Sequence, residues 1–240
     1  MFKLNDGGQL ALDWSIPENC LDICPVVIIL PGLTGTTHDR YVQSLAKTIN
    51  DLRYKAVVFN YRGGNGAALL TPKIYCACDT DDIQAVVWYI KKKWPRCQCM
   101  AVGISVGGGL LFNYLSRNDA ERTGLKAAMI ISTPWDPVAS SKSLEQYAYR
   151  FIFNRRLTKN LCHIVQQNKE ILQSMVDVDA ALKASLIREF DELVTAPLSG
   201  FKTANDYYRA AAIYHKVNMV SVPTVCLNAE DDCFSPIEGM

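Results

Sequence analysis

Short apolar runs alternate with amphipathic segments along the first 132 residues. Apolar runs typical of strands occupy five stretches, at 8–14, 25–30, 55–60, 99–104 and 125–132. Helical spacing of apolar side chains, or helix start and stop signals, mark three intervening stretches, at 39–52, 79–94 and 106–116. Strands that alternate with helices of this length predict an α/β fold, with a mostly parallel sheet and helices on both faces.

The rhythm changes after residue 140. Strand-like runs disappear, and long amphipathic patterns take over at 144–152, 161–175 and 178–194. A strand pattern returns at 222–228. We therefore predict one domain whose core comprises residues 1–140 and 216–240, interrupted by a helical lid over residues 141–215. The alternative is that these helices simply pack on the sheet.

Composition excludes several classes of function. The 240-residue chain is 49% hydrophobic and 20% charged, with a formal net charge of +1, as expected of a globular domain with a sizeable core. Its longest basic run is Lys91-Lys92-Lys93, so nucleic acid is not expected as a partner. No apolar run is long enough to span a bilayer, and no secretory leader follows Met1.

The nine cysteines include two C-x-C pairs, Cys76/Cys78 and Cys97/Cys99, whose spacing is not that of zinc ligands. Reduced thiols and an intracellular location are the expectation. No metal or organic cofactor is expected.

The strongest chemical signal is the pattern Gly-x-Ser-x-Gly at residues 103–107, preceded by an apolar run and followed by a helical segment. In this context the pattern predicts a nucleophile elbow, in which a sharp strand-to-helix turn exposes the hydroxyl of Ser105. A chance match in a glycine-rich turn is the alternative. The elbow interpretation indicates acyl transfer by a serine nucleophile.

Two further segments fit that chemistry. The loop at 30–35 follows an apolar strand, and backbone N–H groups of Leu33 and Val106 are the candidates for an oxyanion hole. After the late strand come Asp231 and Asp232, either of which could orient an imidazole; we prefer Asp231 from its offset after the strand. Helix capping is the alternative role for these carboxylates.

The general base is the missing element. The three histidines are His38, His163 and His215, and none follows Asp232, although Ser-Asp-His is the usual chain order. Surface or packing roles are the expectation for all three.

Taken together, these motifs resemble a known family, the alpha/beta-hydrolase-domain-containing proteins one and three, in the larger group that includes bacterial and yeast medium-chain esterases. The matching segments are 6–9, 12–14, 30–35, 57–63, 70–72, 103–108, 187–191, 206–208 and 227–232. The resemblance implies an alpha/beta-hydrolase fold and a serine hydrolase acting on acyl esters. In the animal members these are phospholipids with medium-length or oxidatively shortened chains.

The resemblance also implies features that this sequence lacks. Family members carry a membrane anchor before the first strand, and they continue past the acid into a further strand and a glycine-flanked histidine. We therefore expect that the final strand and helix are missing, that Ser105 lacks its base, and that this chain is almost inactive. A membrane surface is the expected partner of the full-length form. The alternative is a non-catalytic lipid-binding or interaction module on a hydrolase scaffold.

Overall fold

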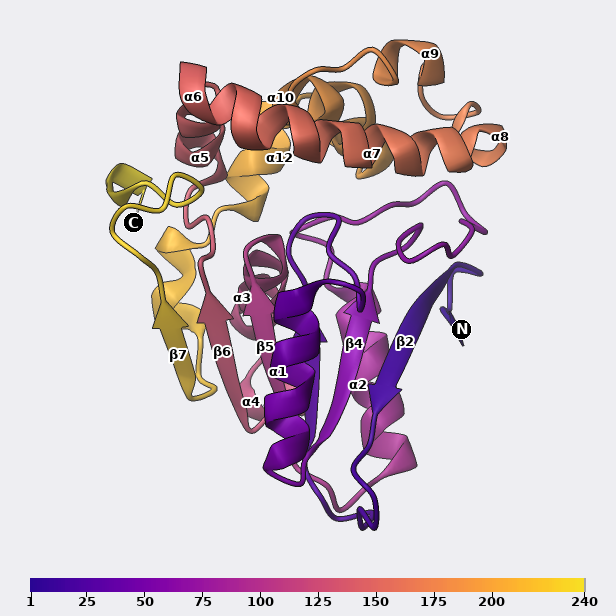
Figure 1. Cartoon of the computed structure of the whole chain (residues 1–240), viewed down its shortest axis with the longest axis vertical. Coiled ribbons are helices and arrows are strands. Elements are labelled where there is room, and N and C mark those ends of the chain that lie inside the picture. The colour runs from indigo at the N-terminus through magenta and orange to yellow at the C-terminus, as the bar shows by residue number, and fades with distance from the viewer. Residues whose placement is uncertain (240) are drawn as a thin grey trace.

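A seven-stranded sheet runs through the molecule in the computed structural model, which describes residues 1–239 (Figure 1). The strands are β1 (Phe2–Lys3), β2 (Gln9–Ser15), β3 (Val26–Leu30), β4 (Lys55–Asn60), β5 (Cys99–Ile104), β6 (Ala127–Ile131) and β7 (Thr224–Leu227). Their order across the sheet is β1-β2-β4-β3-β5-β6-β7. Strands β3 to β7 are parallel, whereas β2 is antiparallel to both β1 and β4.

The central strand β3 shows why helices cover both faces of the sheet. All five of its residues are buried, and successive side chains point to opposite faces. Val26, Ile28 and Leu30 belong to one hydrophobic cluster, while Val27 and Ile29 belong to another. Because the strand is apolar on both faces, helices have to cover both faces of the sheet.

Three helices provide that cover. Helix α1 (Arg40–Asp51) packs Val42 and Ile49 onto the face of Val27 and Ile29. Helices α2 (Asp81–Lys93) and α3 (Val106–Arg117) pack onto the other face, together with the short helix α4 (Ala120–Thr123) beside them. The predicted parallel sheet with helices on both faces is confirmed.

Helical segments fill residues 137–219, between β6 and β7. We call these residues the lid region, after the lid predicted over residues 141–215. It contains α5 (Pro137–Leu144), α6 (Tyr147–Tyr149), η1 (Arg150–Asn154), α7 (Arg155–Gln167), α8 (Lys169–Leu172), α9 (Val178–Ala181), α10 (Ile187–Phe190), η2 (Asp191–Thr195), α11 (Ala196–Leu198), α12 (Ala204–Ala211) and η3 (Tyr214–Met219), and η4 (Ile237–Gly239) follows β7. Helix α7 extends across the carboxyl ends of the strands (Figure 1).

The helix boundaries expected in this region were partly wrong. Residues 147–167 form one continuous helical run through α6, η1 and α7, whereas separate helical patterns were expected at 144–152 and 161–175. The helix expected over 178–194 is interrupted, because Leu186 is extended and the Glu189 carboxylate accepts backbone N–H bonds from Ser185 and Leu186, which starts a new helix. Apolar periodicity alone does not reveal such a local cap.

The lid region has a core of its own, and part of it comes from the loop after β4. Leu69 and Ile74 from that loop pack with Leu161, Val165 and Phe190 of the lid region. The backbone N–H of Leu69 also donates to the side-chain oxygen of Asn168, at 2.8 Å. No helix among residues 1–239 combines the length and apolarity needed to cross a bilayer.

Arg62 fixes the start of the same loop. Its guanidinium donates to the two carboxylate oxygens of Asp82 at 2.6 and 2.7 Å and lies 2.8 Å from Asp6. The Arg62 side chain is only 3% exposed. A buried cation held by two carboxylates ties the first turn of the chain to the N-terminus of α2.

We expect Arg62→Met to lower the free energy of unfolding by about 2–3 kcal/mol, because it leaves two carboxylates without their cation. This is less than for a fully buried pair, since the Asp6 side chain is 40% exposed and solvent screens it. Urea unfolding at neutral pH measures the change. The matched control is Lys47→Met, which removes an exposed pair with Asp51 and should cost below about 0.5 kcal/mol; equal losses would contradict the assignment.

Candidate active site

Ser105 occupies the turn between β5 and α3. Its backbone has φ 53° and ψ −123°, which is a strained conformation for a residue with a side chain and costs about 1–3 kcal/mol. The turn is held by backbone bonds: the Ser105 N–H donates to Ile131, and its carbonyl accepts from Gly108 and Gly109. This is the geometry of a nucleophile elbow.

Glycines are required around this turn because backbone segments approach one another closely. A Cβ on Gly103 would lie 2.5 Å from the carbonyl oxygen of Gly107. A Cβ on Gly107 would collide with the carbonyl oxygens of Leu30 and Pro31 at the end of β3. The glycine spacing in the sequence therefore reflects contact between the elbow and the neighbouring strand.

The loop after β3 lies against the elbow. Its Gly32 donates a backbone bond to the Tyr41 hydroxyl at 3.0 Å, and a Cβ there would be 3.4 Å from that of Ser105. Leu33 and Val106 line the same cavity as Ser105. Within residues 1–239, neither of their N–H groups has a protein acceptor. The two N–H groups proposed from sequence are thus both free to bind an oxygen.

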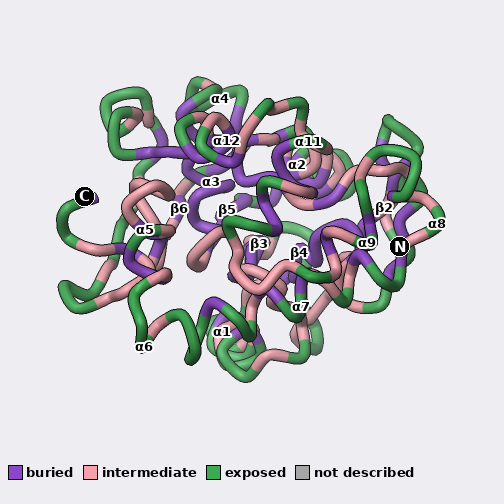
Figure 2. The backbone as a smooth tube through the Cα atoms, turned by 90° about the horizontal axis from the view of Figure 1, so that it is seen from above, coloured by how far each residue is buried: buried purple, intermediate pink, exposed green. Residues whose placement is uncertain are grey.

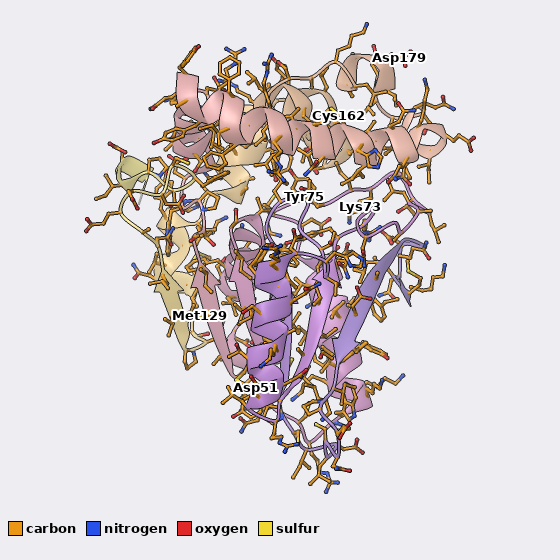
Figure 3. All side chains as sticks on the ribbon, in the orientation of Figure 1. Asp51, Lys73, Tyr75, Met129, Cys162 and Asp179 are labelled. Carbon is orange, nitrogen blue, oxygen red and sulfur yellow. The ribbon has the colours of Figure 1, made fainter. Side chains whose placement is uncertain are left out.

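A cavity of about 480 Å³ opens over Ser105, between the carboxyl ends of the strands and the lid region. Its walls are mainly apolar and include Leu144 and Leu157 from the lid region. Tyr75, from the loop after β4, also lines it and lies between α7 and the sheet (Figure 3). A space of this size and character suits a small apolar or acyl-bearing ligand.

Of the two candidate carboxylates, only Asp232 lines this cavity. Asp232 is half-buried in a turn after β7, and its Oδ1 accepts the Phe234 N–H at 2.9 Å. Asp231, which its offset after the strand favoured, is exposed and is not part of the cavity wall. The turn is anchored by Asn228, which donates to the Thr133 carbonyl and accepts from Trp135.

The three histidines lie outside the wall of the cavity over Ser105. His38, His163 and His215 are all exposed, and none of them lines the cavity over Ser105. His163 lines a separate cavity between α7 and the loops after β3 and β4. Residues 1–239 therefore bring a serine, two free N–H groups and a carboxylate together, without an imidazole.

A buried polar group on the cavity wall was not anticipated as part of the site. Asp191 is 2% exposed, and its Oδ2 accepts the Tyr208 hydroxyl bond at 2.8 Å while Oδ1 has no partner among residues 1–239. Burial raises the pKa of Asp191 to about 6. The sequence did offer a signal for this group. Asp191 is an acidic residue next to Phe190 and on the same helix face as Val194, where burying a charge costs folding free energy.

We expect Asp191 to make the fold less stable as pH rises from about 4 to about 6. The folded state keeps a proton that the unfolded state releases in this window, so ionising the buried carboxyl costs folding free energy, on the order of 3 kcal/mol. Asp191→Asn should remove this dependence on pH. The free energy of unfolding of the variant should therefore rise relative to that of the parent between about pH 4 and about pH 6, and the difference should stay constant at higher pH. Urea unfolding of both proteins at several pH values measures the difference; parallel curves would contradict the raised pKa.

Comparison with known proteins agrees with this architecture. A family model described as alpha/beta hydrolase fold matches residues 25–239. The chain belongs to the alpha/beta-hydrolase family. Est1E from Butyrivibrio proteoclasticus has the same fold, with a TM-score of 0.59 at 20% identity over 99% of this chain and 80% of that one.

Curated relatives are more similar in sequence. Protein abhd-3.2 of Caenorhabditis elegans is 39% identical over 98% of this chain and 63% of its own length. Phospholipase ABHD3 of Mus musculus is 39% identical over 98% of this chain and 58% of its own length. Monoacylglycerol lipase of Saccharomyces cerevisiae is 31% identical over 92% and 50%. The chain thus spans about half to three-fifths of the length of these relatives.

Proposed function

We propose that this chain is a serine hydrolase of the phospholipase or carboxylesterase type. The Ser105 hydroxyl attacks the ester carbonyl, a base takes its proton, and the alcohol leaves with a proton. Water then hydrolyses the acyl-serine by the same route, releasing the acid. The observation that carries this proposal is Ser105 at positive φ, facing an apolar cavity that it shares with the free N–H groups of Leu33 and Val106.

The substrate class is proposed from the cavity and the relatives together. The cavity walls suit an acyl chain, and two of the relatives are named phospholipase and monoacylglycerol lipase. We propose acyl esters of lipids, with medium-chain or shortened-chain phospholipids first. The N–H groups of Leu33 and Val106 would stabilise the oxyanion, which is worth about 3–4 kcal/mol for one donor in a comparable site.

For the acid we propose Asp232, because it lines the cavity of Ser105 and Asp231 does not. A carboxylate in this role orients an imidazole and stabilises its charged form. The imidazole is the group that His38, His163 and His215 do not supply in this structure. We therefore propose that residues 1–240 alone turn over esters very poorly.

A longer form that adds a carboxyl-terminal segment carrying a histidine should be far more active than residues 1–240. Loss of the base in a serine hydrolase lowers turnover by about 10⁶-fold. Hydrolysis of a short-chain chromogenic ester measures both forms, and Ser105→Ala should abolish the activity of the longer one. Comparable rates in the two forms would contradict the need for a further histidine.

Within the longer form, Asp232→Asn should lower kcat by about 10⁴-fold, because the imidazole would lose its orienting partner. The neighbouring variant Asp231→Asn is the matched control and should change kcat by less than about tenfold, as for a solvated carboxylate. Steady-state kinetics of the two variants decide the assignment. A larger loss in Asp231→Asn would make Asp231 the acid.

The second candidate is a non-catalytic lipid-binding module, favoured by the absence of a histidine from the cavity wall within residues 1–239. It differs from the first in one measurable respect. A serine-directed fluorophosphonate should label the longer form at Ser105 if the hydrolase proposal holds. Failure to label or hydrolyse, together with retained binding of a fatty acid analogue, would favour the binding module.

A further inference from the structure

The helical run 147–167 carries an unusual distribution of charge. The run contains no acidic residue, although it contains four basic ones, Arg150, Arg155, Arg156 and Lys159. The whole chain has a net charge of only +1. Positive charge is therefore concentrated on this helix.

The same helix exposes large apolar side chains. Tyr147 is 83% exposed, Phe151 49% and Ile152 59%. The tube around α6 is coloured as exposed when the molecule is viewed from the lid side (Figure 2). We call Tyr147, Phe151, Ile152, Arg155, Arg156 and Lys159 the lid stripe; all six are exposed.

The stripe is continuous along the helix. Tyr147, Phe151, Arg155 and Lys159 follow one another at intervals of four residues, so they share one face. The rings of Tyr147 and Phe151 meet edge to face at 5.2 Å, and the Arg155 guanidinium lies 4.9 Å from the Phe151 ring centre. Asn154, Thr158, Leu161 and Val165, which are buried, form the opposite face.

We propose that the lid stripe binds the surface of a lipid bilayer that contains anionic lipids. A helix with exposed aromatic and aliphatic side chains beside arginines and lysines is suited to the headgroup region, where the rings enter the acyl boundary and the cations meet lipid phosphates. Two residues of the same helical run, Asn154 and Leu157, line the cavity over Ser105. The proposal thus deepens the proposed function by placing the cavity one helix away from a source of lipid substrate.

Charge argues against a second copy of the chain as the occupant. In a two-fold symmetric contact the same patch meets itself, so the three basic side chains of one stripe would face those of the other. A bilayer with anionic headgroups instead offers the complementary charge. An apolar contact flanked by three cations fits that surface without repulsion.

The test is sedimentation with vesicles, using the Ser105→Ala form so that lipid is not consumed. Vesicles are made of phosphatidylcholine alone or of phosphatidylcholine with phosphatidylserine. The chain should bind the mixed vesicles more tightly, and binding should weaken as ionic strength rises from about 0.05 to about 0.5 M. Arg155→Gln with Arg156→Gln should weaken binding to mixed vesicles by roughly 25-fold, at about fivefold for each cation.

Phe151→Ser with Ile152→Ser should weaken binding to both kinds of vesicle. Two matched controls lie outside the lid region: Lys92→Gln with Arg96→Gln removes two exposed cations, and Leu52→Ser removes an exposed apolar side chain. Both controls should bind within about twofold of the parent, since they leave the stripe intact. Thermal unfolding of every variant checks that a loss of binding is not a loss of fold.

Three outcomes would overturn the proposal: no binding to mixed vesicles, equal loss in the controls, or a dimer that Phe151→Ser with Ile152→Ser converts to a monomer in light scattering. The last would assign the stripe to self-association. Hydrolysis of a water-soluble ester by the longer form tests the catalytic proposal separately. Loss of the vesicle-binding proposal would therefore leave the hydrolase proposal intact, and loss of the hydrolase proposal would leave the vesicle-binding proposal intact.

Discussion

The arrangement of the site depends on how closely the elbow backbone approaches the end of β3. Gly107 sits against the carbonyls of Leu30 and Pro31, where no Cβ can fit. This contact fixes the separation between the Ser105 turn and the loop that follows β3, and both are extensions of paired strands. Leu33 and Val106 therefore line the same cavity as Ser105 because the sheet places them there.

That constraint explains how a strained residue is retained. The Ser105 conformation is unfavourable by itself, but it is held by hydrogen bonds to β6 and to the first turn of α3. Strain of this kind persists only where the surroundings determine the backbone completely. On one side of the site the sheet therefore determines the backbone, whereas the other walls come from the lid region and from the loop after β4.

Local pattern predicted the sheet and the strand-to-helix turn at Ser105 well, because both depend on neighbouring residues. The strand at 99–104 and the small residues around Ser105 could be placed from sequence since burial and close packing restrict residue types there. The choice between Asp231 and Asp232 could not, because adjacent loop residues differ only in which one the turn directs to the cavity. Asp191 could not be assigned to the site from sequence either, because its surroundings include residues distant along the chain, such as Tyr208 of α12.

The loop after β4 gives the lid region a second attachment to the core. Leu69 and Ile74 lie within the lid's own hydrophobic cluster, and Asn168 holds the backbone of Leu69. The Arg62 ion pairs in turn hold the beginning of that loop to the turn before β2 and to α2. The lid region is thus attached to the core at more than one place. A large displacement of the lid region has to move the loop after β4 with it or break a buried hydrophobic cluster. Ligand entry through small side-chain rearrangements at the cavity rim therefore costs less free energy than displacement of the whole lid region.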